Sequence, residues 1–185
     1  FTTNVWGSYQ SDHGRNQAWF EFSSQLGALL NLDVVQLPVY SWGCAIGHAI
    51  RMAARMTGRS KVLVPLLSDP ERLSVIHTYC QPLQMDSHIQ VVTLAADPTT
   101  GQIDLSDLKD KLGPDVAAVY FENPAYLGTI ETDAAEIGRL ARDAGAETIV
   151  GVDPISLGVL KAPGDYGADF VTGPVQSLGV HMQCG

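Results

Sequence analysis

The 185-residue sequence has no run of about 18 apolar residues, the length that a helix needs to cross a bilayer. It has no basic stretch followed by an apolar one at its start, so no secretory signal is visible. Its three cysteines are far apart and lack CxxC or Cys/His ligand spacing, which disfavours a disulfide framework and a zinc site. We therefore expect a protein of the reducing cytoplasm with no membrane span.

Paired histidines and excess positive charge are absent as well. The five histidines form no HxxH or HExxH pattern, so we expect no histidine metal centre. Twenty acidic against eleven basic residues give a net charge of −9, which would repel nucleic-acid phosphates. What the sequence does have is 45 % hydrophobic and 17 % charged residues, a balance typical of a globular domain with a packed core.

From residue 61 onward, short β-rich runs alternate with helical patterns, which is typical of βαβ units and a mostly parallel sheet. Several runs are apolar without alternation, as expected when helices cover both faces of the sheet. Thr132 is the predicted cap of the last helix, and Gly145 is predicted to end it. We expect strands at 61–64, 88–94, 116–121, 148–152 and 168–172, and helices at 70–80, 105–112 and 133–144.

The first sixty residues predict two further helices. One spans residues 17–30, and the other begins near Gly43 and ends at Gly58. No repeat or linker follows them, so we predict a single α/β domain over residues 1–185, a three-layer sandwich with helices on both faces of the sheet. Because the sequence begins with Phe1 rather than Met, we also expect a domain that is truncated at both ends.

The first candidate site is the small-residue turn of residues 41–45, which leads into the second helix. Gly43 and Cys44 would place free amides at the positive end of the helix dipole, where anions bind. A glycine also removes the Cβ that would block close approach. An ordinary tight start to a helix would explain the same residues, so both readings stay open.

The second candidate is Asp153, which together with Pro154 follows an apolar strand. Ligands of α/β folds bind at the carboxyl edge of the parallel sheet, and the proline keeps Asp153 extended so that it points off the strand. Its carboxylate could hold a protonated pyridine nitrogen, or it could cap the following turn. The third candidate is the segment 173–179 after the last strand, which contains Ser177.

These three segments, in this order and spacing, resemble the fold-type-I pyridoxal-phosphate enzymes. Within that superfamily they are most similar to the glycine decarboxylase P-protein of the glycine cleavage system, in its first, non-lysine subunit. The most specific stretch runs from 153 to 179 and reads DPISLGVLKAPG, GAD and QSLG. Earlier matching segments are SYQ (8–10), QAWFEF (17–22), LDV (32–34), KVLV (61–64) and NPAYLG (123–128).

The resemblance implies the large domain of the pyridoxal-phosphate-dependent transferase type without its lysine. In this family the second of two related subunits carries the Schiff-base lysine, and Ser177 stands about where that lysine would be. A hydroxyl cannot form an imine with an aldehyde. The resemblance therefore implies that Gly43, Cys44, Asp153 and Ser177 form a vestigial cofactor site. Pyridoxal phosphate would be held covalently by the partner subunit.

The implied activity is that of glycine dehydrogenase (aminomethyl-transferring), an oxidoreductase that decarboxylates glycine and passes the aminomethyl group to the lipoylated H-protein. The isolated chain would be inactive, and it would lend Tyr9 and Gln10, from a polar turn before the first helix, to the lysine-bearing subunit. Two alternatives remain: a non-catalytic scaffold paralogue that stabilises a partner, and a self-sufficient pyridoxal-phosphate transferase or lyase. The sequence departs from the family pattern at the bulky Trp42 and in a shorter segment at 9–15.

Overall fold

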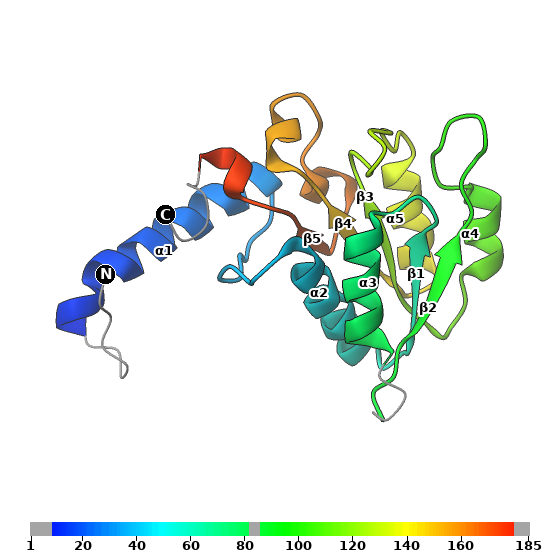
Figure 1. Cartoon of the computed structure of the whole chain (residues 1–185), viewed down its shortest axis with the longest axis horizontal. Helices are drawn as coiled ribbons and strands as arrows, with labels where there is room; N and C mark the ends of the chain where they lie inside the picture. Colours follow the sequence, from blue (N-terminus) through cyan, green and yellow to red (C-terminus); the bar gives the residue numbers. More distant parts are fainter. Residues whose placement is uncertain (1–8, 82–85, 180–185) are drawn as a thin grey trace. The chain divides into compact units, whose positions relative to one another are not determined.

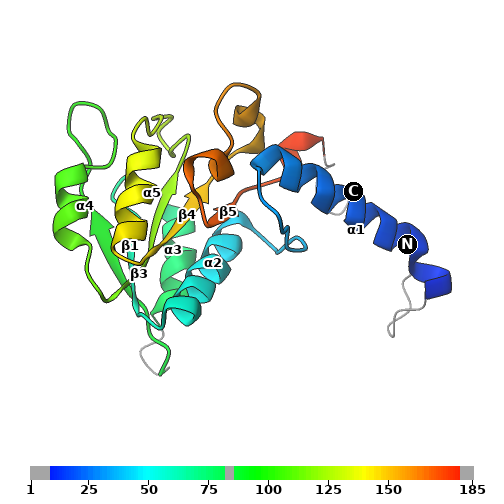
Figure 2. The same cartoon turned by 180° about the vertical axis from the view of Figure 1, so that it is seen from behind.

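The computed structural model describes residues 9–81 and 86–179, and side chains from Asp12 onward. The chain divides into two compact units, residues 1–38 and 39–185 (Figures 1 and 2). The first contains one long helix, α1 (Tyr9–Leu30), which begins earlier than residue 17. Residues 13–17 are exposed and include no large apolar residue, so no apolar stripe marks the true start of the helix. The expectation of one domain stays a prediction.

The second unit is built on a five-stranded parallel sheet with the strand order β2-β1-β3-β4-β5. Every residue of β3 is buried, as expected for a central strand covered on both faces. The mostly parallel α/β sheet is confirmed, and each strand boundary lies within two residues of its predicted place. The strands are β1 (Lys61–Pro65), β2 (Gln90–Leu94), β3 (Val116–Glu122), β4 (Glu147–Gly151) and β5 (Phe170–Thr172).

Four helices complete the three layers (Figures 1 and 2). The pleat of β3 sends Ala118 and Tyr120 into the core under α2 and α3, and Val119 and Phe121 into the core under α4 and α5. The predicted sandwich with helices on both faces is therefore confirmed. The helices are α2 (Trp42–Thr57), α3 (Pro70–Cys80), α4 (Leu105–Lys111) and α5 (Ala134–Asp143).

The helix ends follow local chemistry with one exception. Gly58 ends α2 and Gly145 follows α5, each with a left-handed φ (68° and 71°) that suits glycine. The predicted Thr132 cap of α5 is wrong, because the capping position is Asp133 and no side chain caps the helix there. The Thr132 hydroxyl instead accepts a hydrogen bond from Gln102 Nε2 at 2.9 Å, which joins two loops. Within the described ranges, no helix combines the length and the apolar character that a membrane crossing requires.

The strand order reverses direction at β1, because the chain first adds β2 on one side and then β3, β4 and β5 on the other. In open α/β sheets, ligands bind outside the carboxyl ends of the strands at such a reversal. The gap between the carboxyl ends of β1 and β3 is therefore where a site is expected.

Candidate functional site

A hollow of about 250 Å³ lies at this carboxyl edge beside the reversal, after β3 and β4, and we call it the switch-point hollow. Its walls come from the first residue of α2, from α3, from the end of β3 with the loop that follows, and from the segment after β4. The fold thus joins the turn before α2 with Asp153, although the two are far apart in the sequence. The lining residues are Trp42, Arg72, Glu122, Pro124, Ala125, Tyr126 and Asp153.

The central contact of the switch-point hollow is an ion pair between Arg72 and Glu122. Arg72 Nε and Nη2 donate to Glu122 Oε1 and Oε2, each at 2.8 Å. Arg72 Nη1 also lies 3.2 Å from Asp69 Oδ2, and Tyr120 donates its hydroxyl proton to Glu122 Oε1 at 2.7 Å. Glu122 is only 4 % exposed, so these donors rather than solvent stabilise its negative charge. Burial raises the pKa of Tyr120, and the Glu122 carboxylate raises it further, which keeps the phenol protonated.

Two aromatic rings flank the guanidinium of Arg72. Its Cζ lies 4.1 Å from the centroid of the Trp42 ring and 5.8 Å from that of the Tyr126 ring, which is within the range of cation–π attraction. The Trp42 indole is held in place because its Nε1 donates to Thr172 Oγ1 at 3.3 Å. The bulky residue that departs from the family pattern is therefore a platform for an arginine.

Gly43 and Cys44 lie in the first turn of α2, as expected, but their contacts have local explanations. The Cys44 amide donates to Ser41 Oγ at 3.2 Å, so the helix cap already uses it. Gly43 is buried, and a Cβ built on it would lie 2.9 Å from Val75 Cβ of α3. Close packing of α2 against α3 therefore accounts for the glycine, in agreement with the reading of an ordinary tight helix start. Hydrogen bonds with Ser41 and then Tyr79 lower the pKa of the Cys44 thiol.

Asp153 and Ser177 are brought together. Asp153 Oδ1 accepts from the Ile155 amide at 3.1 Å, so the carboxylate caps the short 3-10 helix η1 (Pro154–Gly158). The same oxygen accepts from Ser177 Oγ at 3.0 Å, from the 3-10 helix η3 (Gln176–Leu178). Asp153 also lines the switch-point hollow, so the same residue caps η1 and belongs to the candidate site.

The remaining predicted residues do not enter the described site. Tyr9 and Gln10 begin α1 rather than standing in a turn before it, and their side chains lie outside the described residues. Lys161 is exposed, and no lysine is among the described residues that line the switch-point hollow. Sequence reasoning missed Arg72 and Glu122. The signal that could have found Glu122 is a carboxylate at the end of an otherwise apolar strand.

These residues do not fit pyridoxal phosphate. The cofactor needs an amine for covalent attachment, and Ser177 offers a hydroxyl to Asp153 instead. Its phosphate would meet the carboxylates of Glu122 and Asp153, while the one lining cation, Arg72, is already paired with Glu122 and Asp69. Stacking of the cofactor ring on Trp42 would also require the Arg72 guanidinium to leave that face.

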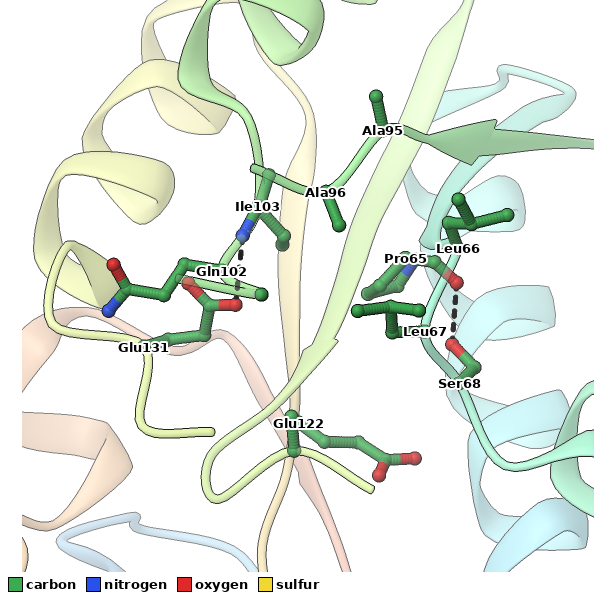
Figure 3. A pocket seen from close by; sticks show the side chains of 12 residues that line it. Pro65, Leu66, Leu67, Ser68, Ala95, Ala96, Gln102, Ile103, Glu122 and Glu131 are labelled. Atoms are coloured by element: carbon green, nitrogen blue, oxygen red, sulfur yellow. Dashed lines mark hydrogen bonds between the residues drawn. The ribbon is translucent and has the colours of Figure 1, made fainter. Parts of the chain in front are cut away.

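A second, narrow pocket beside the switch-point hollow contains another buried carboxyl group (Figure 3). Glu131 is 5 % exposed, and its Oε1 accepts from the Ile103 amide at 3.0 Å. Burial raises the pKa of this carboxyl. The Glu131 amide donates to Asn123 Oδ1 at 3.2 Å, which closes the loop that follows β3. In Figure 3 the Glu122 carboxylate is directed away from Glu131, so the two groups serve different contacts.

Comparison with known proteins places these features in context. Residues 3–185 match the family described as glycine cleavage system P-protein. The chain is 40 % identical over 181 residues to a protein from Pyrococcus furiosus named probable glycine dehydrogenase (decarboxylating) subunit 1, covering 96 % of this chain and 39 % of that protein. A protein of the same name from Staphylothermus marinus is 39 % identical over 170 residues, with 91 % and 35 % covered.

Among solved structures, the chain is similar to glycine decarboxylase (P-protein) of the glycine cleavage system in inhibitor-bound form. The TM-score is 0.80 at 35 % identity, and the match covers 91 % of this chain and 36 % of that chain. A sphingosine-1-phosphate lyase from Burkholderia pseudomallei, at a TM-score of 0.57 and 18 % identity, shares the fold. The chain thus spans less than two-fifths of the length of the relatives that it matches.

Proposed function

The chain belongs to the glycine cleavage system P-protein family, and from that premise we propose that it acts as the non-lysine subunit of glycine dehydrogenase (decarboxylating). The names of its relatives, subunit 1, imply a second subunit. In this proposal the second subunit carries the Schiff-base lysine and holds pyridoxal phosphate covalently. The assembled enzyme works in the cytoplasm and passes the aminomethyl group of glycine to a lipoylated H-protein.

One observation carries the proposal, namely the hydrogen bond from Ser177 Oγ to Asp153 Oδ1 at 3.0 Å. In the family pattern these two positions face the cofactor, one as the covalent anchor and the other as the partner of the pyridine nitrogen. Here Ser177 supplies a hydroxyl in place of the amine, and it donates to the carboxylate, which supports a chain without a covalent cofactor anchor. The chain's own share is then to pair with the partner subunit and to lend it Tyr9 and Gln10.

Reconstitution tests this division of labour. The purified chain, the lysine-bearing subunit, or both together are supplied with pyridoxal phosphate, glycine and H-protein, and exchange of labelled carbon dioxide into glycine is measured. We expect exchange only when both subunits are present. Exchange by this chain alone would contradict the proposal, and it would favour a self-sufficient pyridoxal-phosphate enzyme.

A second candidate function is that of a non-catalytic scaffold for a partner. Apolar side chains stand exposed after the carboxyl ends of the strands, among them Leu127 (65 %), Ile155 (58 %) and Val159 (92 %). Such side chains are suited to cover another protein. The reconstituted pair separates the two functions, because a pure scaffold predicts that substitutions at Tyr9 and Gln10 leave the exchange rate unchanged.

A further inference from the structure

The guanidinium of Arg72 forms part of the wall of the switch-point hollow, and its neighbours hold it there in the manner of a bound ligand. It is planar, it stacks on Trp42 at 4.1 Å, and its Nε and Nη2 form a two-pronged bond to the buried carboxylate of Glu122. Tyr126 stands on another side at 5.8 Å. An aromatic platform with a carboxylate at its edge is the arrangement by which proteins recognise planar cations.

The charges around Arg72 favour a cation as well. Asp69 lies 3.2 Å from Arg72 Nη1, and Asp153 lines the same hollow as Glu122. Two carboxylates thus pair with one guanidinium, and a third lines the same hollow. Removal of the guanidinium would leave an acidic, aromatic-walled cavity, and the Glu122 carboxylate inside it would be buried without a counter-charge.

We propose that the Trp42 ring and the Glu122 carboxylate form a binding site for a planar cation at the wall of the switch-point hollow, and that Arg72 is its built-in occupant. By occupying the platform of Trp42, Arg72 closes this vestigial site to an anionic cofactor. The inference goes beyond the proposed function, since it concerns what the site of this chain binds rather than what the assembled enzyme catalyses. It is tested without a partner subunit or glycine turnover, so its failure and that of the proposed function are distinguishable.

Chemical rescue of the full chain tests the site. We expect Arg72→Ala to lower the melting temperature by about 6 °C or more. Methylguanidinium at about 10 mM, far below denaturing concentrations, should restore at least roughly half of that loss by binding the folded state. N-methylurea has the same shape without the charge, and methylammonium has the charge without the planar fork, so neither should restore it.

The matched control is Arg139→Ala. Arg139 also forms a two-pronged bond, to Glu136, but on the exposed face of α5, where no aromatic ring of the described residues stacks on it. Methylguanidinium should leave this variant and the unsubstituted chain unchanged. The double variant Arg72→Ala/Glu122→Gln should lose the rescue, because the carboxylate that holds the cation is gone. An equal response of the control, or no gain for Arg72→Ala, would overturn the proposal.

A second variant keeps the proposal testable even where Arg72→Ala does not fold. Ser177 is exposed, so Ser177→Lys is compatible with the fold and restores an amine beside Asp153. With Arg72 still on Trp42, we expect no borohydride-trapped pyridoxyl adduct at position 177 when pyridoxal phosphate is equimolar. An adduct at that position would show that Arg72 does not close the site, and would overturn the inference.

Discussion

Glu122→Gln isolates the charge of one buried carboxylate while it keeps the volume of the side chain. In the folded chain, Glu122 is 4 % exposed and accepts three hydrogen bonds, two from Arg72 and one from Tyr120. The amide of the variant retains one acceptor oxygen but turns an N–H group toward a donor of Arg72 or Tyr120. The variant therefore loses the ion pair, and its amide N–H faces another hydrogen-bond donor with no acceptor between them.

The magnitude follows from burial and from the remaining partner. Breaking a buried pair by removing one charge costs about 3–5 kcal/mol. Asp69 still lies 3.2 Å from Arg72 Nη1 and compensates in part, so we expect the lower end, about 3 kcal/mol. For a chain of this size that corresponds to a fall of about 6–12 °C in the melting temperature.

Urea unfolding followed by tryptophan fluorescence measures this loss, and Glu136→Gln is the matched control. Glu136 accepts two hydrogen bonds from Arg139 at 2.7 and 2.8 Å, so the geometry is the same while both groups face solvent. We expect no measurable shift of the unfolding midpoint for the control. A loss in Glu122→Gln that is no larger than in Glu136→Gln would refute the claim that the buried pair stabilises the sheet edge.

Three further outcomes follow from the structure. In a Cys184→Ser background, Cys44 should react with a disulfide reagent in the folded chain, since its pKa is lowered, whereas Cys80 should react only on unfolding, because burial raises its pKa to about 11. Burial raises the pKa of Glu131, so ionisation of this carboxyl favours the unfolded chain. The folded chain therefore loses stability as the pH rises from 4.5, the pKa of the unfolded chain, through the higher pKa of the folded chain. Glu131→Gln should remove that loss, so the variant's gain in stability over the unsubstituted chain should grow between about pH 4 and about pH 8. A gain that stays constant over this range would disprove the prediction. Tyr9→Phe should slow carbon dioxide exchange of the reconstituted pair by about tenfold at unchanged melting temperature, and an unaltered rate would make Tyr9 a structural residue.

The sheet could be predicted because its strands are short apolar runs bounded by breakers. Residues 116–121 show this most clearly, since all of them are buried in β3. The start of α1 could not be predicted in this way, because residues 13–17 are exposed and carry no apolar period. The Thr132 cap failed for a tertiary reason, since Gln102 from another loop binds that hydroxyl.

The candidate site was predictable only in part. Asp153 and Ser177 follow strands of a parallel sheet, so their meeting at the carboxyl edge is a consequence of topology. The pair of Arg72 and Glu122 joins α3 to the end of β3, and no local pattern links two such residues. Trp42 was conspicuous as a bulky residue in a small-residue turn, but its partner appears only when α3 is placed beside α2.

The most direct test of the account is to locate the cofactor in the assembled enzyme. The chain and the lysine-bearing subunit are combined with equimolar pyridoxal phosphate, reduced with borohydride, digested and examined by peptide mass analysis. We predict that the pyridoxyl group is found on a lysine of the partner subunit and on no peptide of this chain. A stoichiometric pyridoxyl adduct on Lys161, or on any other lysine of this chain, would contradict the assignment of a non-lysine subunit.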